Sequence, residues 1–456
     1  MSTIVSIATA PGIGGIGIIR MSGEKTFEII EKIFKPKNPQ KIEDIKGYSI
    51  KYGNIVDEEE IIDEVLVSYF KAPKSYTTEN MCEINSHGGN VVEKKILEIC
   101  LKNGAELAEP GEFTKRAFLN GRIDLAQAES VIDIINAKSE KEMKSGIKQL
   151  EGFLSKEISK IKQEILDVLV NVDVTIDYPE YDVPEVQENE IEKMLKSINI
   201  KLQNLEKSFD NGKIIKEGIK TAIIGKPNAG KSSLLNAILK ENRAIVTDIE
   251  GTTRDTIEEF VTINGIPLKI IDTAGIREAK DEVEKIGITK SIKEAEEADL
   301  IVAIFDSSKE LTKEDEEILK IIEGKKVIIL LNKIDLKSVI TENDERLTKV
   351  TKNILKISAL NKEGIENIYE KISEMFNLNE INLDNNVLIT NIRHKNIISN
   401  AIENVKKANE ALKMNMPIDI IAIYLKEILE DLGEITGEVV TDDIIKEIFS
   451  KFCLGK

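Results

Sequence analysis

Cysteine, histidine and tryptophan are scarce in this chain of 456 residues, which has three cysteines, two histidines and no tryptophan. Cys82, Cys100 and Cys453 are too few and too scattered for a disulfide framework, and no Cys-x-x-Cys pair indicates structural zinc. With only His87 and His394, an imidazole-rich metal site is not expected. No apolar run approaches the roughly 18–20 residues of a membrane span, and a secretory signal is lacking. We therefore expect a soluble, cytoplasmic protein with no membrane partner.

Positive charge is also in deficit. The chain has 63 lysines and arginines against 81 aspartates and glutamates, which gives a formal net charge of −18. Phosphate contacts come from Lys and Arg and dominate nucleic-acid affinity, so a broad basic binding surface is disfavoured. Any contact with RNA must be local or shared with a partner.

The hydrophobic pattern changes along the chain and predicts three domains. Residues 1–118 alternate β-rich runs (3–8, 15–21, 65–69) with helical stretches (25–34, 91–102), as in a small α+β domain. Residues 119–217 are long, Leu/Ile-periodic and rich in Lys and Glu, with helical segments such as 124–137 and 139–172, and the helical pattern returns over 377–456. We expect one helical domain built from these two distant segments.

Between the helical segments, residues 218–376 alternate apolar strands with charged helices. Four runs are candidate parallel strands: 220–224, 268–271, 300–305 and 326–331. This alternation is typical of a doubly wound α/β sheet. The predicted fold class is therefore a multidomain α/β and α protein, with a Ras-like P-loop domain inserted into the helical domain.

A complete phosphate loop opens the inserted domain, because residues 225–232 read Gly-Lys-Pro-Asn-Ala-Gly-Lys-Ser. Gly225 and Gly230 allow the backbone N–H groups to surround phosphate oxygens. Lys231 can reach the β- and γ-phosphates, and Ser232 can ligate Mg²⁺. The helical run that follows adds its positive N-terminal end to the anion site.

The base is predicted from Asn332-Lys333-Ile334-Asp335, which follows an apolar strand. The Asp335 carboxylate can accept hydrogen bonds from guanine N1–H and the exocyclic amine, which adenine cannot offer. Asn332 and Lys333 would brace the loop and cover the base. Ser358 and Ala359 stand where a backbone N–H reads guanine O6. The order and spacing of these motifs favour GTP over ATP.

Two segments between these motifs are candidate switches. Asp272 is placed to meet Mg²⁺ through water, and the Gly275 N–H can sense the γ-phosphate. Thr253 is the expected second protein ligand of Mg²⁺. Ile276 stands where Ras-type GTPases carry a water-orienting glutamine, so another group must position the water. Arg254 and Arg277 are candidate arginine fingers or simple loop ion pairs.

The segments 225–233, Gly-Thr-Thr-Arg-Asp (251–255), Asp-Thr-Ala-Gly-Ile-Arg (272–277) and 332–335 resemble GTPases of the Era and EngA type. Alone they leave ribosome assembly and RNA modification open. The flanking segments 9–20, Ser-His-Gly-Gly (86–89), 118–129 and Phe-Cys-Leu-Gly-Lys (452–456) resemble the tRNA-modification GTPase MnmE (TrmE) family over essentially the whole chain.

The resemblance implies a homodimer through N-terminal domains that bind 5-formyl- or 5,10-methylene-tetrahydrofolate, and G domains that dimerise transiently in a K⁺-dependent way. With the FAD protein MnmG (GidA), the only source of FAD, the family installs aminomethyl or carboxymethylaminomethyl groups at C5 of the tRNA wobble uridine. GTP hydrolysis would drive the conformational change.

Site residues follow from the motifs and the resemblance together. The nucleotide would be held by Asn228, Ala229, Gly230, Lys231, Ser232, Ser233, Thr247, Thr252, Thr253, Asp272, Thr273, Ala274, Gly275, Asn332, Lys333, Asp335, Ser358 and Ala359. K⁺ would be held by Asn228, Thr247, Ile249 and Thr252, and Mg²⁺ by Ser232 and Thr253. Asp272 and Thr253 are expected to act in catalysis through Mg²⁺. The resemblance adds Glu284 as the residue that orients the water, although from the residues alone 281–287 is a solvated acidic run.

The resemblance places folate at Arg20, Glu83, Arg122 and Lys456, with Cys453 as a possible catalytic thiol. Gly12, Gly14 and Gly17 formally match a dinucleotide fingerprint, but a strand-like run follows them instead of a helix, which disfavours a second nucleotide site.

Two alternatives stay open. An Era- or EngA-like ribosome-assembly GTPase would need a basic RNA-binding module, which the acidic balance disfavours. A folate enzyme regulated by GTP would turn folate over without a flavoprotein.

Overall fold

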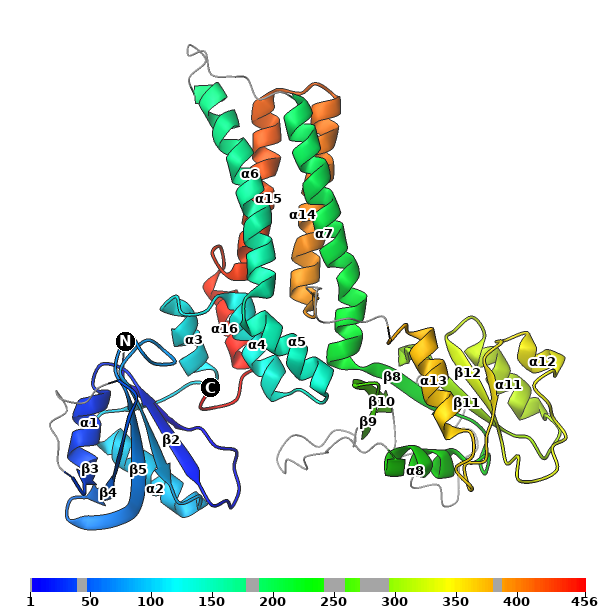
Figure 1. The fold of residues 1–456 in the computed structure, drawn as a ribbon, viewed down its shortest axis with the longest axis horizontal. Coiled ribbons are helices and arrows are strands. Elements are labelled where there is room, and N and C mark those ends of the chain that lie inside the picture. The colour runs from blue at the N-terminus through cyan, green and yellow to red at the C-terminus, as the bar shows by residue number, and fades with distance from the viewer. Residues whose placement is uncertain (1, 39–46, 178–187, 242–258, 271–294, 380–387) are drawn as a thin grey trace. The chain divides into compact units, whose positions relative to one another are not determined.

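The computed structural model describes residues 2–38, 47–177, 188–241, 259–270, 295–379 and 388–456 (Figure 1). Two compact units divide the chain. Unit 1 comprises Met1–Ile132, Gln149–Lys162 and Lys426–Lys456, and unit 2 comprises Asp133–Lys148 and Gln163–Leu425. Unit 2 therefore combines the sheet formed within residues 219–356 with the short helical segment 133–148, which precedes that sheet by about seventy residues in the chain.

Unit 1 contains a largely antiparallel sheet with the strand order β3-β4-β5-β6-β2-β1-β7 among the described residues. Its strands are β1 (Ile4–Ile7), β2 (Gly17–Ser22), β3 (Phe34–Pro36), β4 (Ser49–Asp57), β5 (Glu60–Phe70), β6 (Met81–Ser86) and β7 (Glu106–Leu107). Helices α1 (Thr26–Ile33) and α2 (Asn90–Lys102) pack on it, and their buried residues join those of the strands in one apolar core. The predicted α+β architecture is confirmed. The run after Gly17 is strand β2, as expected.

Further helices make up most of the segments 112–217 and 392–450 (Figure 1). They are α3 (Glu112–Leu119), α4 (Leu125–Ile135), α5 (Glu140–Leu150), α6 (Phe153–Asp177), α7 (Glu188–Glu217), α14 (Ile392–Lys413), α15 (Ile418–Thr436) and α16 (Asp442–Ser450). The expected single helical segment 139–172 is wrong, because Gly152, with φ of +78°, ends it between α5 and α6. Within the described part of the chain, no helix combines the length and apolarity that crossing a bilayer requires.

The sheet of unit 2 has the order β13-β12-β11-β8-β10-β9. Its strands are β8 (Ile219–Ile224), β9 (Glu259–Ile263), β10 (Ile266–Ile270), β11 (Leu300–Asp306), β12 (Val327–Asn332) and β13 (Ile354–Lys356). Its helices are α8 (Lys231–Glu241), α11 (Lys313–Ile322), α12 (Glu345–Thr348) and α13 (Ile365–Met375). All four predicted strands are present and parallel, and β9 adds an antiparallel edge.

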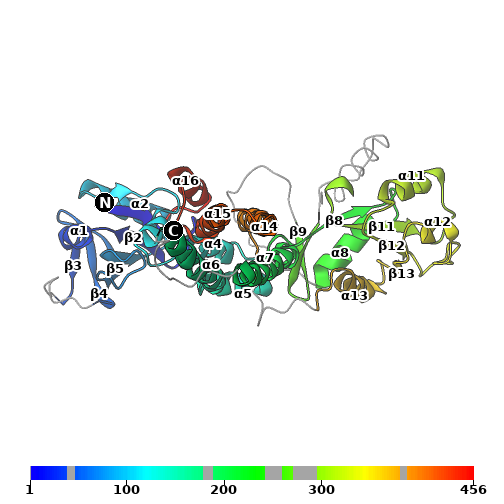
Figure 2. The ribbon, with the colours of Figure 1, turned by 90° about the horizontal axis from the view of Figure 1, so that it is seen from above.

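Alternate residues of β11 face two different cores. Leu300, Val302 and Ile304 join α8 and α13, whereas Ile301 and Phe305 join α11. Figure 2 shows these helices on opposite sides of the sheet. A strand buried on both faces reads as a continuous apolar run, which is why the pattern was visible in the sequence.

The N-terminal end of α5 packs against the β9–β10 hairpin within unit 2. Asn264 and Gly265, with φ of +49° and +77°, form the two-residue turn of this hairpin. The Lys138 Nζ atom lies 3.8 Å from the centroid of the Phe260 ring. A Cβ atom added to Gly265 would lie 3.2 Å from Lys141 Cγ, so the turn is in close contact with α5.

Glu142 caps the first turn of α5 while it is buried. Its carboxylate accepts a 2.6 Å hydrogen bond from the Lys138 N–H, and its own N–H donates to Ser139 Oγ at 3.1 Å. Burial raises the pKa of Glu142 to about 7, against the opposing effect of the Lys138 hydrogen bond. The folded protein therefore binds this proton more tightly than the unfolded chain does. The resulting stabilisation is present at low pH and is lost as the pH rises through about 7.

We expect Glu142→Gln to raise the melting temperature relative to wild type at pH 8, by an amount equivalent to about 1–3 kcal/mol, and to give less benefit at pH 5. Thermal denaturation across this pH range measures the difference. Glu140→Gln on the same helix is the matched control, because Glu140 is exposed and pairs with Lys144 at 2.7 Å. If Glu142→Gln changed the melting temperature by the same amount at every pH, this would contradict a raised pKa at Glu142.

Candidate functional sites

The phosphate loop joins the end of β8 to the start of α8. Asn228 and Gly230 have φ of +62° and +111°. A Cβ atom on Gly225 would lie 2.5 Å from Ile304 O, so β11 leaves no room for a side chain there. Lys231 Nζ donates to the carbonyl of Gly225 at 2.5 Å. The curled backbone and the inward-turned lysine form an anion cradle.

Asn332, at the end of β12, connects the phosphate loop to the segment expected to read the base. Its Nδ2 donates to Ala229 O at 2.8 Å, and its Oδ1 accepts from the Ala359 N–H at 2.9 Å. The Ser358 hydroxyl donates to Asp335 Oδ1 at 2.5 Å. The structure thus brings the residues predicted for phosphate and for guanine together at the carboxyl edge of the parallel strands, where ligands of such sheets bind.

Lys333 lies beside this edge with φ of +67°. Its Nζ pairs with Asp306 Oδ2 at 2.7 Å. Ser232 and Ser233 lie in the first turn of α8, directly after Lys231. The remaining candidates, Thr247, Ile249, Thr252, Thr253, Asp272, Thr273, Ala274, Gly275 and Glu284, lie outside the described residues.

A second cluster lies in unit 1, around Arg20 on β2. Its guanidinium contacts Glu83, the registered partner on β6, with N–O distances of 2.9 and 2.8 Å. Arg20 also donates to Gly455 O at 3.0 Å, which ties the C-terminal tail to the sheet. Lys456 O accepts from Phe113 N at 3.1 Å. Burial first, and then the Arg20 charge, lower the pKa of the Lys456 amine.

Tyr76 joins this cluster and was missed in the sequence. The Arg122 guanidinium carbon lies 4.7 Å from the centroid of its ring, and that of Arg20 lies at 5.9 Å. Its hydroxyl lies 2.9 Å from Thr114 Oγ1. A cation over an aromatic face is attracted by the ring quadrupole. Arg20, Glu83, Arg122 and Lys456 are thereby grouped, and Cys453 is exposed on the same tail.

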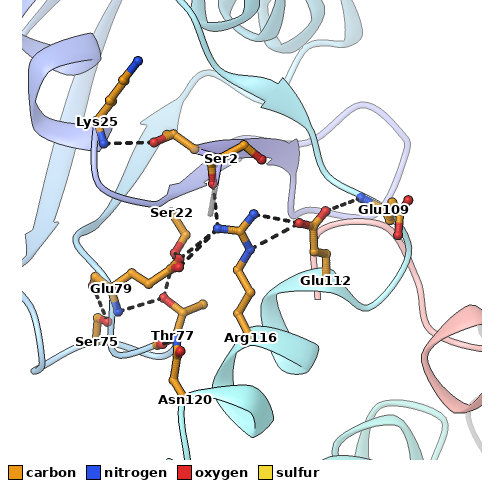
Figure 3. Close-up of polar contacts among 11 residues, drawn as sticks. Ser2, Ser22, Lys25, Ser75, Thr77, Glu79, Glu109, Glu112, Arg116 and Asn120 are labelled. Atoms are coloured by element: carbon orange, nitrogen blue, oxygen red, sulfur yellow. Dashed lines mark hydrogen bonds and ion pairs between the residues drawn. The ribbon is translucent and has the colours of Figure 1, made fainter. Parts of the chain in front are cut away.

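Arg116 forms a buried charged network beside this cluster, with 4% of its side chain exposed (Figure 3). It donates to Ser2 O at 2.7 Å, to Glu112 Oε1 at 2.8 Å and to both Glu79 oxygens at 3.2 Å. Glu79 also accepts from the Ser22 hydroxyl at 2.7 Å. This network fixes α3 and the segment before β6 to the N-terminal strand, and no local sequence signal predicts it.

The chain matches known protein families along most of its length. Residues 3–122 match the family described as GTP-binding protein TrmE N-terminus, and residues 125–453 match the MnmE helical domain. A tRNA modification GTPase MnmE of Clostridioides difficile is 51% identical over 100% of this chain and 99% of its own length. This chain belongs to the MnmE family of tRNA modification GTPases.

Other MnmE relatives agree. Those of Acetivibrio thermocellus and Thermoanaerobacter pseudethanolicus are 49% and 52% identical, each over 100% of this chain and 99% of the relative. Among solved structures, the FeoB G-domain of Methanococcus jannaschii matches 35% of this chain and 98% of that chain, with 25% identity and a TM-score of 0.25. Membership of the MnmE family sets aside the Era- or EngA-like alternative.

Proposed function

We propose that this chain hydrolyses GTP and that the hydrolysis serves the modification of tRNA. Its relatives are named for these two activities. The observation that carries the proposal is the double hydrogen bond of Asn332. It links the Ala229 carbonyl of the phosphate loop to the Ala359 N–H of the base-reading segment, at 2.8 and 2.9 Å. One side chain thus links the two segments that we propose hold the phosphates and the guanine.

Metal ions complete the proposed nucleotide site. Ser232 and Thr253 would hold Mg²⁺, and Asn228, Thr247, Ile249 and Thr252 would hold K⁺. Of these residues the structure describes Asn228, which has φ of +62°, and Ser232, which lies in the first turn of α8. A bound cation beside the phosphates offsets negative charge that develops during hydrolysis.

The protein groups would do the remaining work. Lys231 and the loop N–H groups bind the phosphates, and Asp335 selects guanine through two accepted hydrogen bonds. Asp272 would meet Mg²⁺ through water, and Glu284 would orient the attacking water in place of the glutamine that Ile276 replaces.

For unit 1 we propose a site for 5-formyl- or 5,10-methylene-tetrahydrofolate at Arg20, Glu83, Arg122 and Lys456. Cations match the carboxylates of a folate, and Arg can bind a carboxylate in a bidentate way. The half-buried Lys456 amine and the exposed Cys453 thiol lie on the same tail. The thiol would lie near the transferred carbon.

The proposed assembly is a cytoplasmic homodimer that works with the FAD protein MnmG on tRNA at C5 of the wobble uridine. The domains would be 1–118, 119–217 with 377–456, and the inserted 218–376. The net charge of −18 supports a shared tRNA site, because the partner would supply part of the basic surface.

The proposal is tested by measuring GTP hydrolysis of the full chain in KCl and in NaCl at equal ionic strength. We expect hydrolysis at least about tenfold faster in KCl, because a fitted cation stabilises the transition state. Asn228→Ala should remove this difference. Equal rates in the two salts would overturn the K⁺-dependent mechanism.

A further inference from the structure

Lys226, an unspecified position of the phosphate-loop motif, is fixed to the first turn of α11. Its Nζ lies 2.6 Å from Asp315 Oδ2 and donates to Thr312 Oγ1 at 2.8 Å. The side chains of Lys226 and Asp315 are 23% and 4% exposed. A charge-assisted hydrogen bond at such a buried carboxylate is among the stronger polar contacts in a protein.

Asp315 is held in place independently of Lys226. It accepts hydrogen bonds from the Thr312 N–H at 2.8 Å and from the Thr312 hydroxyl at 3.0 Å, and the first of these is one arm of a capping box. The apolar face of α11 is buried through Ile318 and Ile322. Asp315 is therefore a fixed point to which the phosphate loop is attached.

The other end of the loop is also attached. Asn332 donates to Ala229 O at 2.8 Å, and the Ala229 N–H donates back to Lys226 O at 3.3 Å. Only Pro227 and Asn228 lie between the two attached residues. The proline ring fixes one backbone dihedral, and Asn228 has φ of +62°. The two residues of this turn are therefore held between two attached residues.

We infer that Lys226 is a positioning residue for Asn228: its ion pair with Asp315 holds the turn in which Asn228 can ligate K⁺. This inference rests on the proposed K⁺ site. Without the ion pair, the turn can relax and bind the cation more weakly. Lys231 donates to the Gly225 and Lys226 carbonyls at 2.5 and 2.9 Å, and Asp335 accepts from Ser358, so neither residue contacts the Lys226 ammonium.

The test is a KCl titration of GTP hydrolysis by the full chain, with choline chloride holding the ionic strength constant. We expect Lys226→Met to raise the half-saturating KCl concentration about tenfold, as expected for a lost hydrogen bond to a charged group. Lys226→Arg should stay within about threefold of wild type, because its guanidinium can still pair with the carboxylate. Lys352→Met, at an exposed lysine of the same unit, is the matched control.

Asp315→Asn removes the carboxylate of the same ion pair. This variant replaces Lys226→Met in the test if melting followed by circular dichroism shows that Lys226→Met folds poorly. The double variant should be no worse than the more affected single variant, because both remove one contact. If Lys226→Met is folded and its half-saturating KCl concentration equals that of the wild type, the inference is overturned and the proposed function is unaffected. If Lys226→Met is unfolded, the same result in Asp315→Asn has the same meaning. Absence of K⁺ activation in the wild type overturns both.

Discussion

Asp335→Asn is expected to lower the affinity for GTP by about 10³-fold, because a site built to hydrogen-bond a polar group strongly rejects a mismatched partner. The Ser358 hydroxyl donates to Asp335 Oδ1 at 2.5 Å, and both carboxylate oxygens keep lone pairs that can accept from the base. In the variant an amide NH₂ would face the exocyclic amine of guanine, donor against donor. Xanthine carries a carbonyl at this position, so xanthosine triphosphate should bind the variant better than GTP does.

Competition of GTP and xanthosine triphosphate against a fluorescent nucleotide measures this exchange of preference. Asp344→Asn is the matched control, since Asp344 caps α12 by accepting from the Arg346 N–H and has no predicted role with the base. Its GTP affinity should stay within about threefold. Unchanged GTP affinity in Asp335→Asn would remove residues 332–335 from the base site.

Arg116→Met is expected to destabilise unit 1 by about 3 kcal/mol. Glu79 and Glu112, with side chains 17% and 18% exposed, would lose the cation between them (Figure 3). Amide hydrogen exchange of the full chain should show peptides of β1 and α3 exchanging about 100-fold faster, since their protection follows the local opening free energy.

Two further variants separate charge from packing. Adding Glu79→Gln and Glu112→Gln to Arg116→Met should restore part of the protection, because no unpaired carboxylate then remains. Arg346→Met is the control, because Arg346 is 45% exposed and its pair with Asp344 is a surface ion pair of small expected effect. Equal exchange in Arg116→Met and Arg346→Met would show that the buried network does not hold unit 1.

The proposed nucleotide site could be predicted from the sequence because each of its motifs is contiguous in the chain. The segments 225–232 and 332–335 carry their chemistry locally, and the buried strands β8 and β12 that lead into them read as apolar runs. Strand β4 was missed, since its Lys51 and Asn54 interrupt the apolar pattern and its Ile50 and Tyr52 are 64% and 48% exposed. Strand periodicity is weak where one face of the sheet lies open.

The clusters of unit 1 were accessible only in part, because their residues are distant in sequence. Arg20 contacts Gly455, which lies 435 positions away in the chain. The family resemblance grouped Arg20 with Lys456, but neither periodicity nor spacing indicates the Tyr76 ring against Arg122 or the burial of Arg116. The Lys226–Asp315 pair is of the same kind, since it depends on where α11 begins.

The most direct test of the account is mass spectrometry of tRNA nucleosides from cells that lack this protein, complemented with wild type, Lys231→Ala or the exposed-lysine control Lys352→Met. The account predicts that C5-aminomethyl or carboxymethylaminomethyl wobble uridines disappear in the deletion. They should return with wild type and Lys352→Met and stay absent with Lys231→Ala, because Lys231 binds the phosphates. Unchanged wobble-uridine modification in the deletion strain would contradict the account.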